Sequence, residues 1–211
     1  MKLKDITYVS QIKDYLIHKK LDRKICEVGC FDGFHLSTLI TENTNLAVGI
    51  DPWEYVGSWA DWDDISSSPY TRGEYNINIM DYDYDHVYEV VKNRFKGNNN
   101  VKLIKATSRE AIQQFDFNLF DFVYIDASNS LLDFTFDLYN WYDRVVPGGI
   151  IGGYNFNDTL QSNNNYIVSI SSVVRSFLSS KEIPTVDLHV CEPIIKDSIE
   201  VTTSAWFFHK I

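Results

Sequence analysis

The sequence predicts an α/β fold built on one doubly wound, seven-stranded and mostly parallel sheet, with helices on both faces and a reversed last strand. Apolar strand-like segments alternate about five times with segments of helical periodicity. Two further strand-like segments close the chain with no helix between them, so they can pair antiparallel. With 211 residues, the chain is long enough for one well-buried domain and short for two, so one domain is expected over residues 1–211.

The spacing of the apolar residues gives the expected elements in order. The first is an amphipathic helix with Ile6, Val9, Ile12 and Leu16 on one face, which we expect at the sheet edge or over the mouth of a site. A long aromatic-rich connection, about 53–81, is expected to form a lid or a substrate loop. The expected strands span about 24–28, 46–51, 101–106, 121–126, 149–153, 185–191 and 202–209, and the later helices about 34–42, 84–95, 109–115, 132–142 and 167–178.

A turn with two glycines follows the first strand. Gly29 lacks a Cβ, so the chain can turn sharply and bring backbone N–H groups near a ligand, while Gly33 lets the next helix start against the sheet. Phe31 occupies the middle position of the G-x-G-x-x-G pattern and would obstruct a pyrophosphate. Asp51, at the end of the second strand, is placed to accept hydrogen bonds from two ribose hydroxyls. The pattern therefore favours a ligand that contains adenosine without a pyrophosphate.

The composition favours a small-molecule ligand. The net charge of −10 and the sequence pI of about 4.8 argue against a surface for nucleic acid or an anionic membrane. Cys26, Cys30 and Cys191 form no C-x-x-C pair, so neither a disulfide framework nor a zinc site is indicated; Cys26 is expected in the core and Cys30 in a loop near the ligand. No apolar run approaches the roughly 18 residues of a membrane span and the start lacks a signal core, so a cytoplasmic protein is expected. The oligomeric state is open, with a homodimer as one alternative.

Polar residues follow several predicted strands. Ligands of doubly wound sheets bind beyond the carboxyl ends of the strands, where the strand order reverses, so these residues are expected to converge on one crevice. They are Glu27, Asp51, the Ala106–Ser108 turn, Asp126 and the Tyr154–Asn155 pair. Asp126 has an alternative role as the cap of the next helix, and His35 is interpreted as a surface or packing residue because no metal partner lies at a readable spacing.

Together these motifs resemble the class I S-adenosylmethionine-dependent methyltransferases. The segment Glu27–Gly33 is similar to their first motif, Gly49–Asp51 to their second-strand acid, and the helix-free final strand pair to their topology. Phe122–Ser130 and Val146–Asn155 resemble the small bacterial O-methyltransferase-like group (methyltransferase family 24-like), which usually carries I-D-x-x-H-S-Y and K-P-G-G-x-x-x-x-H-D. The resemblance covers nearly the whole chain.

The resemblance implies S-adenosylmethionine as the cofactor and methyl transfer to an oxygen of a small molecule, such as a sugar or a secondary metabolite. Because the sulfonium is an activated methyl donor, aligning a nucleophilic oxygen behind the methyl supplies much of the rate, and a base completes the reaction. The implied catalytic residues are Asp126, close to the transferring methyl, and Asn155. The implied cofactor contacts are Glu27 and Gly29 at the methionine portion, Cys30 and Gly33 in the turn, Asp51 at the ribose, Trp53 with Ala106, Thr107 and Ser108 around the adenine, and Asp126.

The chain departs from this group where a base or a metal is usual. Asn129 stands where the group usually has His, and Tyr154 and Asn155 where it has His-Asp. Asp126 and Asn155 still offer oxygens, and Asp158 is near in sequence, but Tyr154 is a poor ligand for a hard cation, so no metal residue is assigned and magnesium stays an alternative. Two other functions stay open. Asn129 and Tyr154 favour a cofactor-binding module with decayed catalytic residues, whereas Phe31 and the final strand pair disfavour a nicotinamide-dependent oxidoreductase.

Overall fold

The computed structural model describes residues 1–54, 83–156, 161–163, 166–192, 195–196, 199–200 and 204–211. Almost all of the predicted lid or substrate loop at 53–81, and Asp158 as well, therefore lie outside the described residues. Among the described residues, no helix combines the length and the apolar composition that crossing a membrane requires.

The predicted sheet is confirmed. Seven strands are hydrogen-bonded in the order β3-β2-β1-β4-β5-β11-β8. All neighbours from β3 to β5 pair parallel, whereas β11, the last strand of the chain, pairs antiparallel with both β5 and β8. The strand order reverses between β1 and β4, and ligands of such sheets bind beyond the carboxyl ends of the strands at this point. The strands are β1 (Lys24–Val28), β2 (Leu46–Asp51), β3 (Val101–Lys105), β4 (Phe120–Ile125), β5 (Val145–Gly153), β8 (His189–Val190) and β11 (Trp206–His209).

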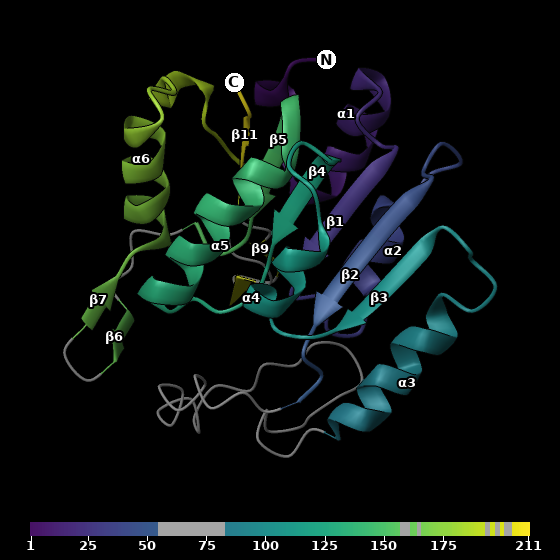
Figure 1. The fold of residues 1–211 in the computed structure, drawn as a ribbon. Helices are drawn as coiled ribbons and strands as arrows, with labels where there is room; N and C mark the ends of the chain where they lie inside the picture. Colours follow the sequence, from purple (N-terminus) through teal and green to yellow (C-terminus); the bar gives the residue numbers. More distant parts are fainter. Residues whose placement is uncertain (55–82, 157–160, 164–165, 193–194, 197–198, 201–203) are drawn as a thin grey trace.

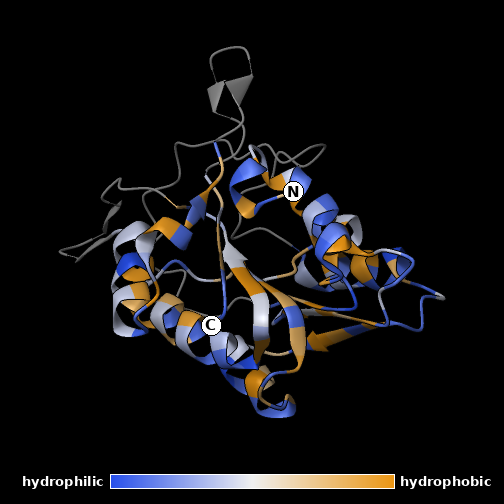
Figure 2. Ribbon diagram, turned by 90° about the horizontal axis from the view of Figure 1, so that it is seen from above, coloured by the Kyte–Doolittle hydropathy of each residue, from blue (hydrophilic) through white to orange (hydrophobic). Residues whose placement is uncertain are grey.

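Helices cover both faces of the sheet. One face packs on α1 (Ile12–Lys19), α2 (Phe34–Leu39) and α3 (Tyr84–Arg94), and the other on α4 (Ser108–Ala111), α5 (Leu131–Arg144) and α6 (Ile170–Ser180). Figure 1 shows the ends of β1, β2 and β4 at one side of the sheet and both chain termini at the other. Figure 2 shows the strands as a mostly hydrophobic centre with hydrophilic outer helix surfaces. The sheet is therefore buried on both faces, as near-continuous apolar parallel strands require.

Several element boundaries differ from the prediction. The expected first helix begins with two 3₁₀ turns, η1 (Leu3–Asp5) and η2 (Val9–Gln11), before α1. This segment reaches the edge strand β8, where Thr7 O accepts a 2.9 Å hydrogen bond from the backbone of Glu192. The strand expected at 185–191 is mostly a 3₁₀ turn, η6 (Thr185–Asp187), because edge strands lack a second partner. The remaining elements are η5 (Ile112–Gln114) and two short hairpins, β6 (Gln161–Asn163) with β7 (Tyr166–Val168) and β9 (Ile195–Lys196) with β10 (Ile199–Glu200).

The last helix illustrates how a local cap overrides periodicity. The apolar spacing extends the predicted helix back to residue 167, but Ser169 precedes α6 and its hydroxyl accepts a hydrogen bond from the Ser172 backbone. Ile167 consequently belongs to β7. From Ile170 onward the prediction is confirmed, since Val174, Phe177 and Leu178 are fully buried against the sheet.

Candidate functional site

The loops that follow the central strands are joined to one another by backbone hydrogen bonds. The Gly29 and Cys30 N–H groups, after β1, donate to Ile50 O of β2 at 2.8 and 3.0 Å. The Asp126 N–H, after β4, donates to Val28 O at 2.7 Å, and the Tyr154 N–H, after β5, donates to Ile125 O at 3.2 Å. The predicted site residues after β1, β2, β4 and β5 are thus brought to one edge of the sheet, as expected from their positions at strand ends.

Gly29 is required by the approach of a neighbouring loop. Its φ is +89°, and a Cβ at this position would lie 2.1 Å from Asp126 O and 2.8 Å from Ala127 Cα. The turn after β1 and the loop after β4 therefore touch through their backbones, which places Asp126 beside the turn. Any larger residue at 29 would force these two loops apart.

Gly33 is required by the packing of a helix against the turn. Its φ is +71°, and an added Cβ would lie 2.4 Å from Val91 Cγ2 and 2.7 Å from the Phe95 ring, both at α3 or its end. The close packing of α3 on the turn fixes where α2 begins. The direction of α2 is consequently decided by a helix that follows the long connection in the chain.

Most backbone N–H groups of this turn already donate hydrogen bonds within the protein. We expected its N–H groups to approach a ligand, but those of Gly29, Cys30, Phe31, Gly33 and Phe34 all donate hydrogen bonds within the protein, to Ile50, Asp51, Cys30 and Asp32. A phosphate-binding turn needs such groups free. These hydrogen bonds disfavour a phosphate cradle at this turn, in addition to the side chain of Phe31.

Asp51 is held from two sides. Its Oδ2 accepts from the Phe31 N–H at 3.0 Å and its Oδ1 accepts from the Trp53 N–H at 2.8 Å. Burial raises the pKa of this carboxyl, while these two hydrogen bonds counteract part of the effect. Each carboxylate oxygen keeps a second lone pair, so the group remains able to accept from a diol. Trp53 itself is buried, with its Nε1–H donating to Phe31 O at 2.7 Å and its ring against Tyr88.

Glu27 lies near the end of β1, on the sheet face covered by α1, α2 and α3, and is 1 % exposed. Its Oε1 accepts a 2.7 Å hydrogen bond from Nδ1 of His35, the second residue of α2. The sequence interpretation of His35 as a surface or packing residue missed this pairing. The glycine turn reverses the chain, so the first turn of α2 faces back over β1, and this reversal was the signal available in the sequence.

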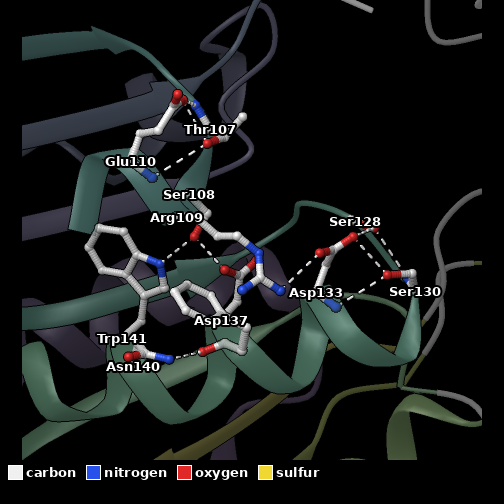
Figure 3. A network of polar contacts seen from close by, with 11 residues as sticks. Thr107, Ser108, Arg109, Glu110, Ser128, Ser130, Asp133, Asp137, Asn140 and Trp141 are labelled. Carbon is white, nitrogen blue, oxygen red and sulfur yellow. Dashed lines mark hydrogen bonds and ion pairs between the residues drawn. The ribbon is translucent and has the colours of Figure 1, made fainter. Parts of the chain in front are cut away.

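The turn after β3 uses its side chains for structure. Thr107 caps α4, where its hydroxyl accepts from the Glu110 N–H. Ser108 Oγ accepts from Trp141 Nε1–H at 2.8 Å and donates to Asp137 Oδ1 on α5. Figure 3 shows these contacts from α4 to α5. Only the backbone of this turn and the Ala106 side chain are therefore left to contact an adenine, and that role stays a prediction.

The same network extends to the loop after β4. Asp133 Oδ2 accepts from the hydroxyls of Ser128 at 3.2 Å and Ser130 at 2.8 Å, while its Oδ1 lies 3.3 Å from Nη2 of Arg109 (Figure 3). The Arg109 guanidinium also lies 4.0 Å from the centroid of the Phe136 ring. The loops after β3 and β4 are thereby tied to one helix, α5, which fixes the spacing between the predicted adenine turn and Asp126.

The crevice is strongly anionic. Burial raises the pKa of the Cys30 thiol well above its ordinary value, and the nearby Glu27, Asp51 and Asp32 carboxylates raise it further. Cys30 is thus a buried, protonated thiol beside three acids. Within the described part of the chain, no Lys or Arg forms an ion pair with Glu27 or Asp51, and Arg94 lies 3.8 Å from Asp32. Such a site attracts a cationic ligand and repels phosphate.

Asp126, Tyr154 and Asn155 follow β4 and β5 at the same edge of the sheet. Asn155 has a φ of +57°, a left-handed conformation that Asn tolerates better than most residues. Tyr124, the buried residue before the end of β4, has its pKa raised well above the ordinary value by burial and then by the Asp126 carboxylate. Asp126 is therefore close to the interior of this face. Among the described residues, no three His, Cys, Asp or Glu side chains gather as a metal site would require.

Comparison with known proteins gives a family and a fold. A family model described as a methyltransferase domain matches residues 26–155, more than half of the chain. The O-methyltransferase TomG from Streptomyces achromogenes has a similar structure, with a TM-score of 0.62 and 13% identity over 96% of this chain and 79% of that one. An O-methyltransferase from Bacillus cereus has a TM-score of 0.58 and 14% identity over 96% of this chain and 82% of that one. The tRNA (m1A58) methyltransferase TrmI from Aquifex aeolicus has a TM-score of 0.55 and 14% identity over 100% of this chain and 76% of that one. No curated protein matches the chain.

The matched family model runs from β1 to the end of β5, so it includes the glycine turn, Asp51, Asp126 and Asn155. At 13–14% identity the structural similarities show the fold alone. With the fold, the strand order and the family model in agreement, this chain belongs to the methyltransferase-domain family and has the class I methyltransferase fold.

Proposed function

We propose that this protein is an S-adenosylmethionine-dependent methyltransferase that transfers a methyl group to an oxygen of a small molecule. The observation that carries the proposal is the cluster of Glu27, Asp51 and Asp32 around Cys30, beside a turn in which most backbone N–H groups already donate hydrogen bonds within the protein. A sulfonium donor is cationic and has no phosphate, so both features suit it. Two of the similar structures are O-methyltransferases, described in complex with S-adenosylmethionine or its product.

In this proposal Asp51 binds the ribose, because its carboxylate is held in place by Phe31 and Trp53 with lone pairs left to accept from two hydroxyls. The donor, when bound, supplies a methyl group already activated on its sulfonium. Asp126 takes the proton of the acceptor hydroxyl, and Asn155 on the neighbouring loop orients that hydroxyl. Magnesium at Asp126 and Asn155 stays an alternative source of activation.

The acceptor class rests on charge. A net charge of −10 disfavours RNA, although a tRNA methyltransferase shares the fold. A small neutral or cationic acceptor is therefore proposed, in the cytoplasm, where free thiols such as the three buried cysteines persist.

Calorimetry with S-adenosylhomocysteine tests the cofactor. The unaltered protein should bind it, and Asp51→Ala should weaken binding at least about tenfold, because the ribose loses its acceptor. Asp116→Ala, an exposed acid between α4 and β4, is the matched control and should bind like the unaltered protein. Absence of binding at millimolar ligand contradicts the proposal, and saturable binding of NADH instead would favour an oxidoreductase.

Turnover distinguishes an enzyme from a module with decayed catalytic residues, the alternative that Asn129 and Tyr154 favour. With S-adenosylmethionine and a panel of sugars and phenols, Asp126→Asn should lower methyl transfer about a hundredfold through loss of the base. The same variant should still bind S-adenosylhomocysteine. Cofactor binding without turnover on any acceptor would support the non-catalytic alternative.

A further inference from the structure

Asp133 on α5 holds the loop that follows β4 through two hydrogen bonds to one carboxylate oxygen. Its Oδ2 accepts from the hydroxyls of Ser128 at 3.2 Å and Ser130 at 2.8 Å. Ser130 is the N-cap of α5, since its own hydroxyl accepts from the Asp133 N–H at 3.2 Å. Capping of the helix therefore accounts for Ser130. It does not account for Ser128, which lies outside the helix and two residues after Asp126.

The Ser128 hydroxyl is used both as an acceptor and as a donor. It accepts from the Ser130 N–H at 3.2 Å and donates its hydrogen to Asp133. At the other end of the loop, the Asp126 N–H donates to Val28 O at 2.7 Å. The loop is thus anchored to β1 at its first residue and to α5 at its third and fifth residues.

The carboxylate that makes these contacts is itself held through its other oxygen. Oδ1 of Asp133 lies 3.3 Å from Nη2 of Arg109 on α4 (Figure 3). The Arg109 guanidinium also lies 4.0 Å from the ring centroid of Phe136, three residues after Asp133 on α5. The side chains of Arg109 and Asp133 are 51% and 32% exposed, so their ion pair contributes little to stability. Its effect is on direction, because with Oδ1 at Arg109 the other oxygen faces the two serines.

We propose that Asp133 is a positioning residue for methyl transfer, which holds the loop after β4 so that Asp126 meets the acceptor hydroxyl. The inference rests on the proposed function, which gives Asp126 the role of the base. A base takes a proton only from an atom within hydrogen-bond distance, so a base on a loose loop is out of reach for part of the time. A misplacement of about 1 Å can cost on the order of a hundredfold in rate. Asp133 therefore acts on the rate of transfer and not on binding of the donor.

Amide hydrogen exchange measured by NMR reports on the loop directly and needs no acceptor. In Asp133→Ala the Ser130 amide should exchange at least about tenfold faster, because Ser128 loses the partner that holds its hydroxyl, while the amides of β4 and α6 keep their rates. Asp133→Asn should stay within about threefold of the unaltered protein, because its amide oxygen still accepts from both serine hydroxyls. Glu89→Ala, which removes a surface ion pair with Lys92 on α3, is the matched control and should leave the loop unchanged.

Methyl transfer separates positioning from folding. With saturating S-adenosylmethionine and the same panel of sugars and phenols, Asp133→Ala should lower the turnover rate at least about tenfold, while S-adenosylhomocysteine binding stays within about twofold. Asp133→Asn should keep turnover within about threefold of the unaltered protein. Ser128→Ala should lower turnover about threefold with an unchanged unfolding midpoint, because it removes the loop contact but leaves the cap of α5 and the ion pair in place.

An unchanged exchange rate of the Ser130 amide in Asp133→Ala, or unchanged turnover in both alanine variants, would overturn the inference and leave the proposed function intact. Equal losses in Asp133→Asn and Asp133→Ala would also overturn it, since the lost charge and not the placement of the loop would be responsible. So would a loss of donor binding as large as the loss of turnover. Failure of the unaltered protein to bind S-adenosylhomocysteine, or to methylate any acceptor, would overturn the proposed function and this inference together.

Discussion

Two buried acids on opposite faces of the sheet are satisfied in different ways. Asp137, between α5 and α4, accepts from Ser108, whose hydroxyl in turn accepts from Trp141 (Figure 3). Burial raises the pKa of Asp137 to about 7, so this acid is protonated in a large fraction of molecules near neutrality. Glu27, between β1 and α2, accepts from His35 on one oxygen, while its other oxygen meets no donor among the described residues. The comparison shows that one acid is built into the packing of two helices, whereas the described residues supply a donor to only one oxygen of the other.

The largest effect is expected from Asp137→Asn. The folded protein holds this proton up to about pH 7, whereas an unfolded Asp releases it near 3.8. The contribution of Asp137 to stability is therefore complete below pH 3.8, falls as pH rises, and is lost above about pH 7. At pH 8 the variant should be more stable by about 2 kcal/mol, because a neutral amide replaces a buried charge.

Urea unfolding of both proteins at several pH values checks this prediction. The difference between their free energies of unfolding should be small at pH 4 and grow toward pH 8. Burial also raises the pKa of Asp51, but both proteins contain Asp51, so its contribution cancels in this difference. A difference that does not depend on pH would contradict a raised pKa for Asp137.

A smaller effect, in the opposite direction, is expected from Ser108→Ala, which removes the hydroxyl between Trp141 and Asp137. Two buried groups lose their partner, so the free energy of unfolding should fall by about 1 kcal/mol. Ser176→Ala, on the exposed side of α6, is the control and should be nearly neutral. If the two variants are equally stable, the network from α4 to α5 does not contribute to the fold.

The smallest change in stability is expected from Glu27→Gln. A neutral amide is cheaper to bury than an ion lacking a donor, so the ligand-free protein should gain about 0.5 kcal/mol. Thermal unfolding without ligand measures this gain. A large loss of stability would show instead that the bond between Glu27 and His35 serves the fold.

Much of the architecture was predictable because it depends on local chemistry. Alternating apolar segments gave the five parallel strands, and a pair of late strands without a helix gave the reversed β11, which the strand order confirms. Helix faces were less reliable. Leu132, the first residue of the helix expected over about 132–142, is 77% exposed, whereas Phe134 and Leu138 of α5 are buried. Periodicity shows that a face exists but not which residues of an end turn find a partner.

The side chains of the site were predictable only in part. The sequence placed Glu27, Asp51, Asp126 and Asn155 at strand ends, and adjacent parallel strands bring such ends together. The partners of these groups were not readable. Thr107 and Ser108 turn toward α4 and α5, and His35 turns back onto β1, because each direction depends on helices packed from other parts of the chain.

The sequence by itself determined the class of the fold, the glycine turn, the exclusion of a pyrophosphate and the family, since these depend on backbone conformation, residue size and hydrophobic spacing. The tertiary structure decided which N–H groups of the turn already donate hydrogen bonds, and which buried carboxyl oxygens receive a donor from the described residues. Hydrogen bonding and burial join residues distant in sequence, such as Ser108 with Asp137 and Gly29 with Asp126, and no local pattern records such pairs. That Oε2 of Glu27 meets no donor in the described part of the chain is consequently visible only in the folded protein.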